Sequence, residues 1–215
     1  MRTLIALMLL AAGAGCTQRA ENPMPRPTKP QKPAALAPAF PESWFGKWRG
    51  DAEVRWPAPS NAANAKVMRL VMELHIGPKL PRDASTSQPQ DTAPRRWKWT
   101  IVYDGAEGRQ ERKYELVERD ANQGLYAIDE KNTIVLPVTL IGDALVSPFE
   151  IQGKMLVCTY RFDAAGAGPD DDTITVEIVV MPMDSEETSG DQGGVPEVKG
   201  YAASSIQRAV MKRRR

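Results

Sequence analysis

Cysteine and histidine are scarce in this sequence of 215 residues, which contains two Cys and one His. The two cysteines, Cys16 and Cys158, lie far apart and form no C-x-x-C motif, so a Cys-based metal site and dithiol redox chemistry are not expected. His75 is the single histidine, which excludes a zinc site made of several histidines and leaves any Ser-His-Asp triad to depend on this one residue. The commonest metal and nucleophilic chemistries are therefore not predicted.

A long apolar run and a strong net charge are also missing. The longest apolar segment, residues 4–12, is shorter than the roughly 20 residues that a membrane-spanning helix needs. The formal net charge is only +1. Phosphate binding requires a concentrated basic surface, so we do not expect nucleic acid as a partner. We interpret the terminal basic cluster, residues 212–215, as a solvated chain end.

Motifs of the common enzyme classes do not occur. The chain has no G-x-S-x-G, S-x-x-K, Walker or G-x-G-x-x-G pattern. The three aspartates at 170–172 lack the spacing of a calcium loop and are interpreted as a solvated hairpin loop. Glu115, Glu118 and Asp120 are either paired carboxylates or alternating charges on an outer strand face, and Cys158 lies among apolar residues as a small core side chain. We predict no catalytic residue, no metal and no cofactor, and we rank an enzyme behind non-enzymatic functions.

The N-terminal segment has the plan of an export signal, with a positive Arg2, an apolar run and then small residues. Gly13-Ala14-Gly15-Cys16 resembles the lipobox of bacterial lipoproteins, in which the Cys sulfur is lipidated. The resemblance implies that residues 1–15 are a lipoprotein signal peptide and that acylated Cys16 anchors an exported cell-envelope protein to the lipid bilayer. The alternative is a secreted soluble protein. With Cys16 lipidated, Cys158 has no disulfide partner.

Proline dominates the segment that follows. Residues 16–43 include "ENPMPRPTKPQKPAALAPAFP". Proline fixes φ and lacks an amide donor, so such a run favours an extended polyproline II conformation and builds no packed core. We predict that residues 16–43 are a linker between the anchor and a domain of residues 44–215.

That domain opens with a strand pattern. Between 47 and 56, Trp48, Gly50, Ala52, Val54 and Trp56 share one face, while the charged residues share the other. A period of two indicates a strand with one buried and one solvated face. In residues 66–76 the same alternation places the single histidine on the polar face.

Further short strands follow at regular intervals, separated by turns rich in Gly, Asp and Asn. We expect them at 97–103, 109–119, 124–129, 133–141, 143–151, 154–162, 173–181 and 198–212. No long segment has helical periodicity. The pattern predicts an all-β domain, a meandering antiparallel barrel of about 8–10 strands, with a β-sandwich as the alternative.

The start of the first strand carries a family resemblance. Gly46-x-Trp48 is similar to the G-x-W motif of lipocalins and the wider calycin barrels. In that family an Arg late in the barrel packs across the Trp indole, and Arg208 in "SIQRAVM" is the matching residue. The resemblance implies a lipocalin-like barrel in which Gly46, Trp48 and Arg208 have structural roles.

Aromatic residues supply the candidate pocket. If the barrel closes, the inward aromatic side chains either fill its core or line a ligand site. The candidates for pocket residues are Trp48, Trp56, Trp97, Trp99 and Tyr114.

Two function classes follow from these features. The first is a membrane-anchored envelope lipoprotein whose barrel binds an apolar or amphipathic small molecule. The second is a non-enzymatic structural or protein-interaction module of the envelope, with a solid core and an envelope protein as its partner. A cavity of several hundred Å³ favours the first, and a filled interior favours the second.

Overall fold

The computed structural model describes residues 40–58, 66–80, 94–165, 168, 170–190 and 196–214. The predicted signal peptide, Cys16 and most of the predicted linker lie outside these residues. Apart from two 3-10 turns, η1 (Glu42–Trp44) and η2 (Ala121–Gln123), every regular element that the described residues form is a β-strand. None of the described helices is long and apolar enough to cross a membrane.

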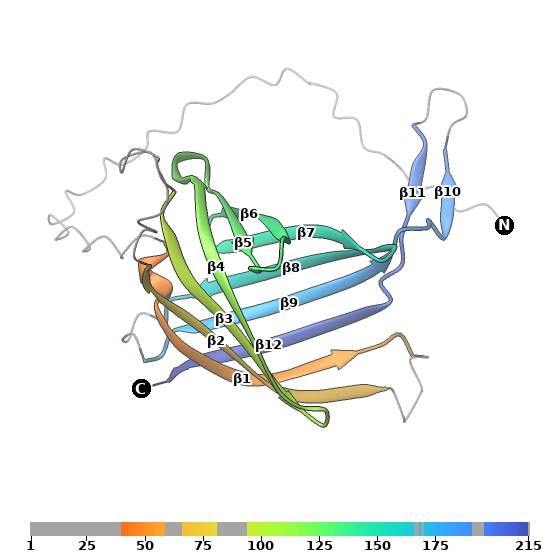
Figure 1. Ribbon diagram of the computed structural model, residues 1–215. Coiled ribbons are helices and arrows are strands. Elements are labelled where there is room, and N and C mark those ends of the chain that lie inside the picture. The colour runs from red at the N-terminus through yellow and green to blue at the C-terminus, as the bar shows by residue number, and fades with distance from the viewer. Residues whose placement is uncertain are drawn as a thin grey trace, which may run out of the picture. The chain divides into compact units, whose positions relative to one another are not determined.

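Ten strands close into one antiparallel barrel (Figure 1). Each strand pairs with the next along the barrel and the last pairs with β1, so the ten barrel strands leave no open edge. Between β9 and β12 the chain forms a separate hairpin of β10 (Glu187–Ser189) and β11 (Val198–Gly200). The barrel strands are β1 (Gly46–Arg55), β2 (Val67–Lys79), β3 (Arg96–Gly105), β4 (Gly108–Asp120), β5 (Leu125–Asp129), β6 (Val135–Ile141), β7 (Ala144–Ile151), β8 (Lys154–Asp163), β9 (Thr173–Pro182) and β12 (Ser205–Arg214).

This architecture confirms the predicted all-β meandering barrel. The number of strands is at the upper limit of the prediction, and the chain does not form the alternative sandwich. The last predicted segment, 198–212, is divided in the structure. Residues 198–200 belong to the hairpin, and the barrel strand begins only at Ser205.

The two faces of the barrel wall differ as the alternation predicts. On the inner face of β1, Trp48, Ala52 and Val54 are buried. The outer face of β1 to β5 carries ion pairs between neighbouring strands. Arg96 of β3, for example, lies 2.7 Å from Glu115. Period-two alternation thus separates an apolar interior from a charged exterior.

Aromatic rings fill the end of the barrel at which β1 begins, which we term the closed end. Trp44 of η1 stacks on Phe162 with ring centroids 5.8 Å apart, and Trp48 meets the same ring edge-on at 6.0 Å. The Trp48 Nε1 donates a hydrogen bond to the backbone oxygen of Trp44 at 2.9 Å. Phe40 lies edge-on to Trp44 and to Tyr126, at 5.1 and 5.0 Å. Phe40, which the sequence analysis places in the linker of residues 16–43, therefore packs with the closed end of the barrel.

The predicted contact between Arg208 and Trp48 is wrong. Arg208 lies exposed on the outer face of β12, in register with Glu53 of β1. Arg213 is the residue that pairs in register with Trp48, and its guanidinium carbon lies 4.2 Å from the Trp48 ring centroid. This distance is within cation–π range. An arginine does cover the indole of Trp48, but it lies five positions later in the chain than the predicted Arg208.

Arg213 also binds the segment that leads into β1. Its guanidinium donates hydrogen bonds to the backbone oxygens of Phe45 and of Ser43, the latter at 3.2 Å, and lies 3.4 Å from an Asp172 carboxylate oxygen. A Cβ at Gly46 would lie 2.8 Å from the same guanidinium, and the φ of +142° at this position also favours glycine. Arg213 is therefore not part of a solvated end, and Asp172, which is buried, is not part of a solvated loop.

Candidate functional site

A cavity of about 510 Å³ occupies the other end of the barrel, which we term the open end. Inward side chains of β3, β4 and β6 to β9 form most of its lining. The exposed turn that joins β3 to β4, residues 105–108, and the start of β12 form part of its mouth. This volume is within the range of about 300–1,000 Å³ that is typical of small-molecule sites.

Two aromatic rings form the deepest part of the lining. Trp99 of β3 and Tyr160 of β8 meet edge-on with their centroids 5.3 Å apart. The indole N–H of Trp99 is buried and has no acceptor among the described residues. Above the two rings the wall is mainly apolar, with Ile101, Ile128, Leu136, Val138, Leu145, Phe149, Leu156 and Ile178.

Phenol and thiol groups interrupt the apolar wall. Desolvation by burial raises the pKa of Tyr103, of Tyr114 and, most strongly, of Tyr160. Burial also raises the pKa of the Cys158 thiol to about 11. At neutral pH these groups are uncharged, so they offer hydrogen bonds to a ligand but no thiolate or phenolate nucleophile.

Charged groups in the lining belong to the open end. They are Arg69, Glu107, Arg112 and Glu130. The guanidinium carbon of Arg112 lies 5.5 Å from the ring centroid of Tyr103. The cavity therefore has an apolar interior, uncharged hydroxyl groups along its wall and charged groups at its mouth, which is the polarity of a site for an apolar or amphipathic molecule.

The structure brings only two of the five candidate pocket residues to the cavity. Trp99 and Tyr114 line it. Trp48 and Trp97 are fully buried and point inward, but neither reaches the cavity lining. Trp56 follows the end of β1 and is half-buried outside the core cluster, with the ammonium of Lys66 4.6 Å from its ring centroid. Trp56 is therefore not among the residues that line the cavity.

Several lining residues were not identified as pocket candidates from the sequence, among them Tyr103, Tyr160 and Arg112. The alternation in 97–103 and 154–162 does place Tyr103 and Tyr160 on inward faces. Their depth in the barrel depends on the register between neighbouring strands, and the alternation within one strand does not specify this register. Arg112 is charged, so an apolar pattern gives no signal for it.

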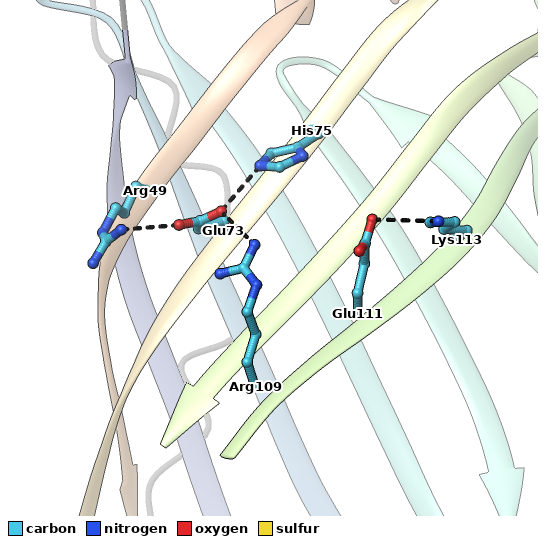
Figure 2. Close-up of polar contacts among 6 residues, drawn as sticks. All are labelled: Arg49, Glu73, His75, Arg109, Glu111 and Lys113. Atoms are coloured by element: carbon cyan, nitrogen blue, oxygen red, sulfur yellow. Dashed lines mark hydrogen bonds and ion pairs between the residues drawn. The ribbon is translucent and has the colours of Figure 1, made fainter.

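The single histidine lies outside the cavity, on the outer face of the barrel as predicted (Figure 2). His75 is half-buried, and its Nε2 lies 3.1 Å from an oxygen of Glu73. Arg49 and Arg109 approach the same carboxylate at 3.0 and 3.5 Å. Burial by itself would raise the pKa of Glu73, but the hydrogen bond with His75 and the charge of Arg109 hold it below its usual value. These contacts make an outer ion-pair cluster that joins β1, β2 and β4.

Each of the three carboxylates that the sequence analysis considered as possible pairs has its own partner in the structure. Glu115 pairs with Arg96 and with Lys131, and Asp120 accepts hydrogen bonds from the backbone at the start of η2. Glu118 pairs with Arg95. Within the described ranges, no group of three or more His, Cys, Asp or Glu side chains is placed to hold a metal ion.

No protein-family model matches the sequence, and no curated protein matches it. The function therefore has to be argued from the cavity itself.

Proposed function

We propose that this protein is a membrane-anchored binding module that holds an apolar or amphipathic small molecule inside its barrel. The observation that carries the proposal is the cavity of about 510 Å³ at the open end. Its walls are mainly apolar side chains on paired strands, so the site is formed before any ligand arrives. Each Å² of apolar ligand surface removed from water there contributes about 25 cal/mol.

The distribution of polarity supports an amphipathic ligand. The apolar part of such a molecule would lie against Trp99 and Tyr160, and its polar part would lie toward Arg112 and Glu130 at the mouth. The indole N–H groups of Trp99 and Trp97 are both buried and without an acceptor in the described part of the chain, so the polar groups that support the proposal are those nearer the mouth.

The alternative function, a structural or interaction module, predicts a barrel whose interior is completely filled. The closed end of the barrel fits this description, because Trp48 and Trp97 are fully buried there. The cavity at the open end does not fit it, and supports the binding function.

Export and the membrane anchor rest on the sequence. The segment from Arg2 to Cys16 supports a lipoprotein signal and an acylated terminus at the cell envelope, and residues 17–39 support a tether.

The test of ligand binding uses the chain from residue 16 with Cys16→Ser, which removes the lipid. Native mass spectrometry examines this protein for co-purified small molecules. Titration with N-phenyl-1-naphthylamine, a neutral amphiphile whose fluorescence rises in apolar surroundings, measures the site directly.

Two matched variants make the titration specific to the cavity. Ile178→Trp places a larger ring in the cavity lining and should weaken probe binding at least tenfold. Ile141→Trp makes the same change at an exposed position at the closed end and should leave binding unchanged. Wild-type protein that binds no probe and carries no small molecule would refute the binding function. Equal probe affinity of both variants would place the probe outside the cavity.

A further inference from the structure

Exposed apolar side chains gather around the mouth of the cavity. Twelve large apolar side chains are exposed in the described part of the chain, and seven of them lie where barrel strands begin or end at the open end. We name these seven the apolar rim: Val67, Met68, Ile134, Val135, Ile151, Met183 and Ile206. They come from the start of β2, the β5–β6 connection, the end of β7, the chain after β9 and the start of β12.

The apolar rim is continuous with the cavity lining. Met68 belongs to both. The amide of Met183 donates a hydrogen bond of 3.0 Å to Gly153, which brings Met183 to the turn that follows Ile151. A surface that covers the rim would therefore also cover the mouth.

The rest of the described surface differs from the rim. Leu125 and Ile141 are exposed at the closed end, and Val210 lies on the same outer face of β12 as Ile206 but farther from the open end, beside Arg208 and Lys212. Val198 and Tyr201 belong to the connection between β9 and β12. Among the described residues, exposed apolar side chains are thus most numerous at the open end, where the mouth of the cavity lies, and such exposure is unfavourable in water unless the rim is covered for part of the time.

We infer that the apolar rim docks on the surface of a lipid bilayer, so that the ligand passes between the bilayer and the cavity. This inference rests on the proposed function, because it takes the ligand to be apolar or amphipathic. Such a molecule resides in bilayers, and transfer through water would expose its apolar surface. When the rim contacts the bilayer, the ligand can enter the cavity without exposing its apolar surface to water.

The chain is long enough for the mouth to reach the bilayer that holds the anchor. The tether enters the barrel at Phe40, which lies at the closed end. The 23 residues from 17 to 39 span at most about 80 Å when fully extended. Strand β1 has ten residues and is about 33 Å long at 3.3 Å per residue. The tether can therefore exceed the length of the barrel about twofold, and the open end can turn toward the membrane.

The experiment is flotation of the chain from residue 16, carrying Cys16→Ser, with vesicles of phosphatidylethanolamine and phosphatidylglycerol at a ratio of 3:1. The wild-type rim should float with the vesicles, and flotation should persist at high salt because the contact is apolar. The double variant Ile151→Ser/Met183→Ser should reduce the partition coefficient at least tenfold. Ile141→Ser, which alters an exposed isoleucine at the closed end, should change it less than twofold.

Three outcomes would overturn the inference. These are a wild-type protein that stays with the soluble fraction, an equal loss for Ile141→Ser, and a dimer in sedimentation velocity that the double rim variant abolishes. The last outcome would make the rim an interface between two copies of the chain. Titration with N-phenyl-1-naphthylamine without vesicles separates this inference from the proposed function. Probe binding without vesicle flotation refutes docking alone, and flotation without probe binding refutes the cavity as the ligand site.

Discussion

Replacing Arg213 by alanine should destabilise the barrel more than any other change at an arginine of β12. The variant loses the cation–π contact with Trp48 at 4.2 Å, the hydrogen bonds to the backbone oxygens of Ser43 and Phe45, and the ion pair with Asp172 at 3.4 Å. The side chains of Arg213 and Asp172 are only 18% and 12% exposed, so water cannot fully replace these contacts.

The magnitude follows from these contacts. A partly desolvated cation–π pair contributes about 1–2 kcal/mol. Removing one member of a largely buried ion pair costs about 3–5 kcal/mol, because the remaining charge has lost its partner. The contributions overlap and do not add. We expect the free energy of unfolding to fall by about 3–5 kcal/mol, which lowers the urea midpoint by roughly 2 M at an m-value of about 2 kcal/mol/M.

The assay is urea unfolding followed by far-ultraviolet circular dichroism, with Arg208→Ala as the control. Arg208 is exposed on the outer face, so its removal should cost less than about 1 kcal/mol. Adding Asp172→Asn to Arg213→Ala should restore part of the loss by removing the unpaired charge. The reasoning is refuted if Arg208→Ala lowers the midpoint as much as Arg213→Ala does.

Two further predictions concern the cysteines. The proposed anchor is a lipid group on the Cys16 sulfur, so Cys16→Ser should release the protein from membranes. Cells labelled with a clickable palmitate should show label on the wild type alone, and unlabelled wild-type protein would contradict the proposed anchor. Burial raises the pKa of the Cys158 thiol to about 11, whereas an unfolded thiol ionises near pH 8.5. Between these values the folded state binds more protons than the unfolded state, so this thiol's contribution to stability is complete below about pH 8.5 and is lost as the pH rises toward 11. Urea midpoints measured between pH 8 and pH 10.5 should therefore show a smaller loss of stability for Cys158→Ala than for the wild type, with a difference of about 2 kcal/mol. Equal losses in the two proteins would show that Cys158 does not titrate in this way.

Alternation along the chain was sufficient to predict the strands and most inward faces. Trp48, Trp97 and Trp99 do point into the barrel, because successive side chains of a strand face opposite sides. It was not sufficient to locate the cavity. Trp97 and Trp99 share a face and are two residues apart, yet only Trp99 reaches the lining. Strand β3 runs from the closed end to the open end, so depth along the barrel decides which inward ring lies against the cavity and which lies below it.

The position of the arginine over Trp48 likewise depended on strand pairing and could not be predicted from the alternation within one strand. In residues 205–214 both faces carry apolar side chains, Ile206 and Val210 on one and Ala209 and Met211 on the other, so the period of two cannot say which face is inside. The pairing of β12 with β1 decides it by setting Arg213, and not Arg208, opposite Trp48. A shift of one residue would reverse every side chain of the strand.

The amino-acid sequence by itself determined the all-β class, the meandering order of the strands, the charged outer face and the position of the single histidine on it. These properties depend on neighbours within one strand or one turn, where spacing and residue type are sufficient. Only the tertiary structure decided which arginine covers Trp48, that Phe40 belongs to the barrel, and that one end is filled while the other encloses a cavity. Those properties depend on the register between strands far apart in the chain, because barrel closure sets which inward side chains meet at each depth.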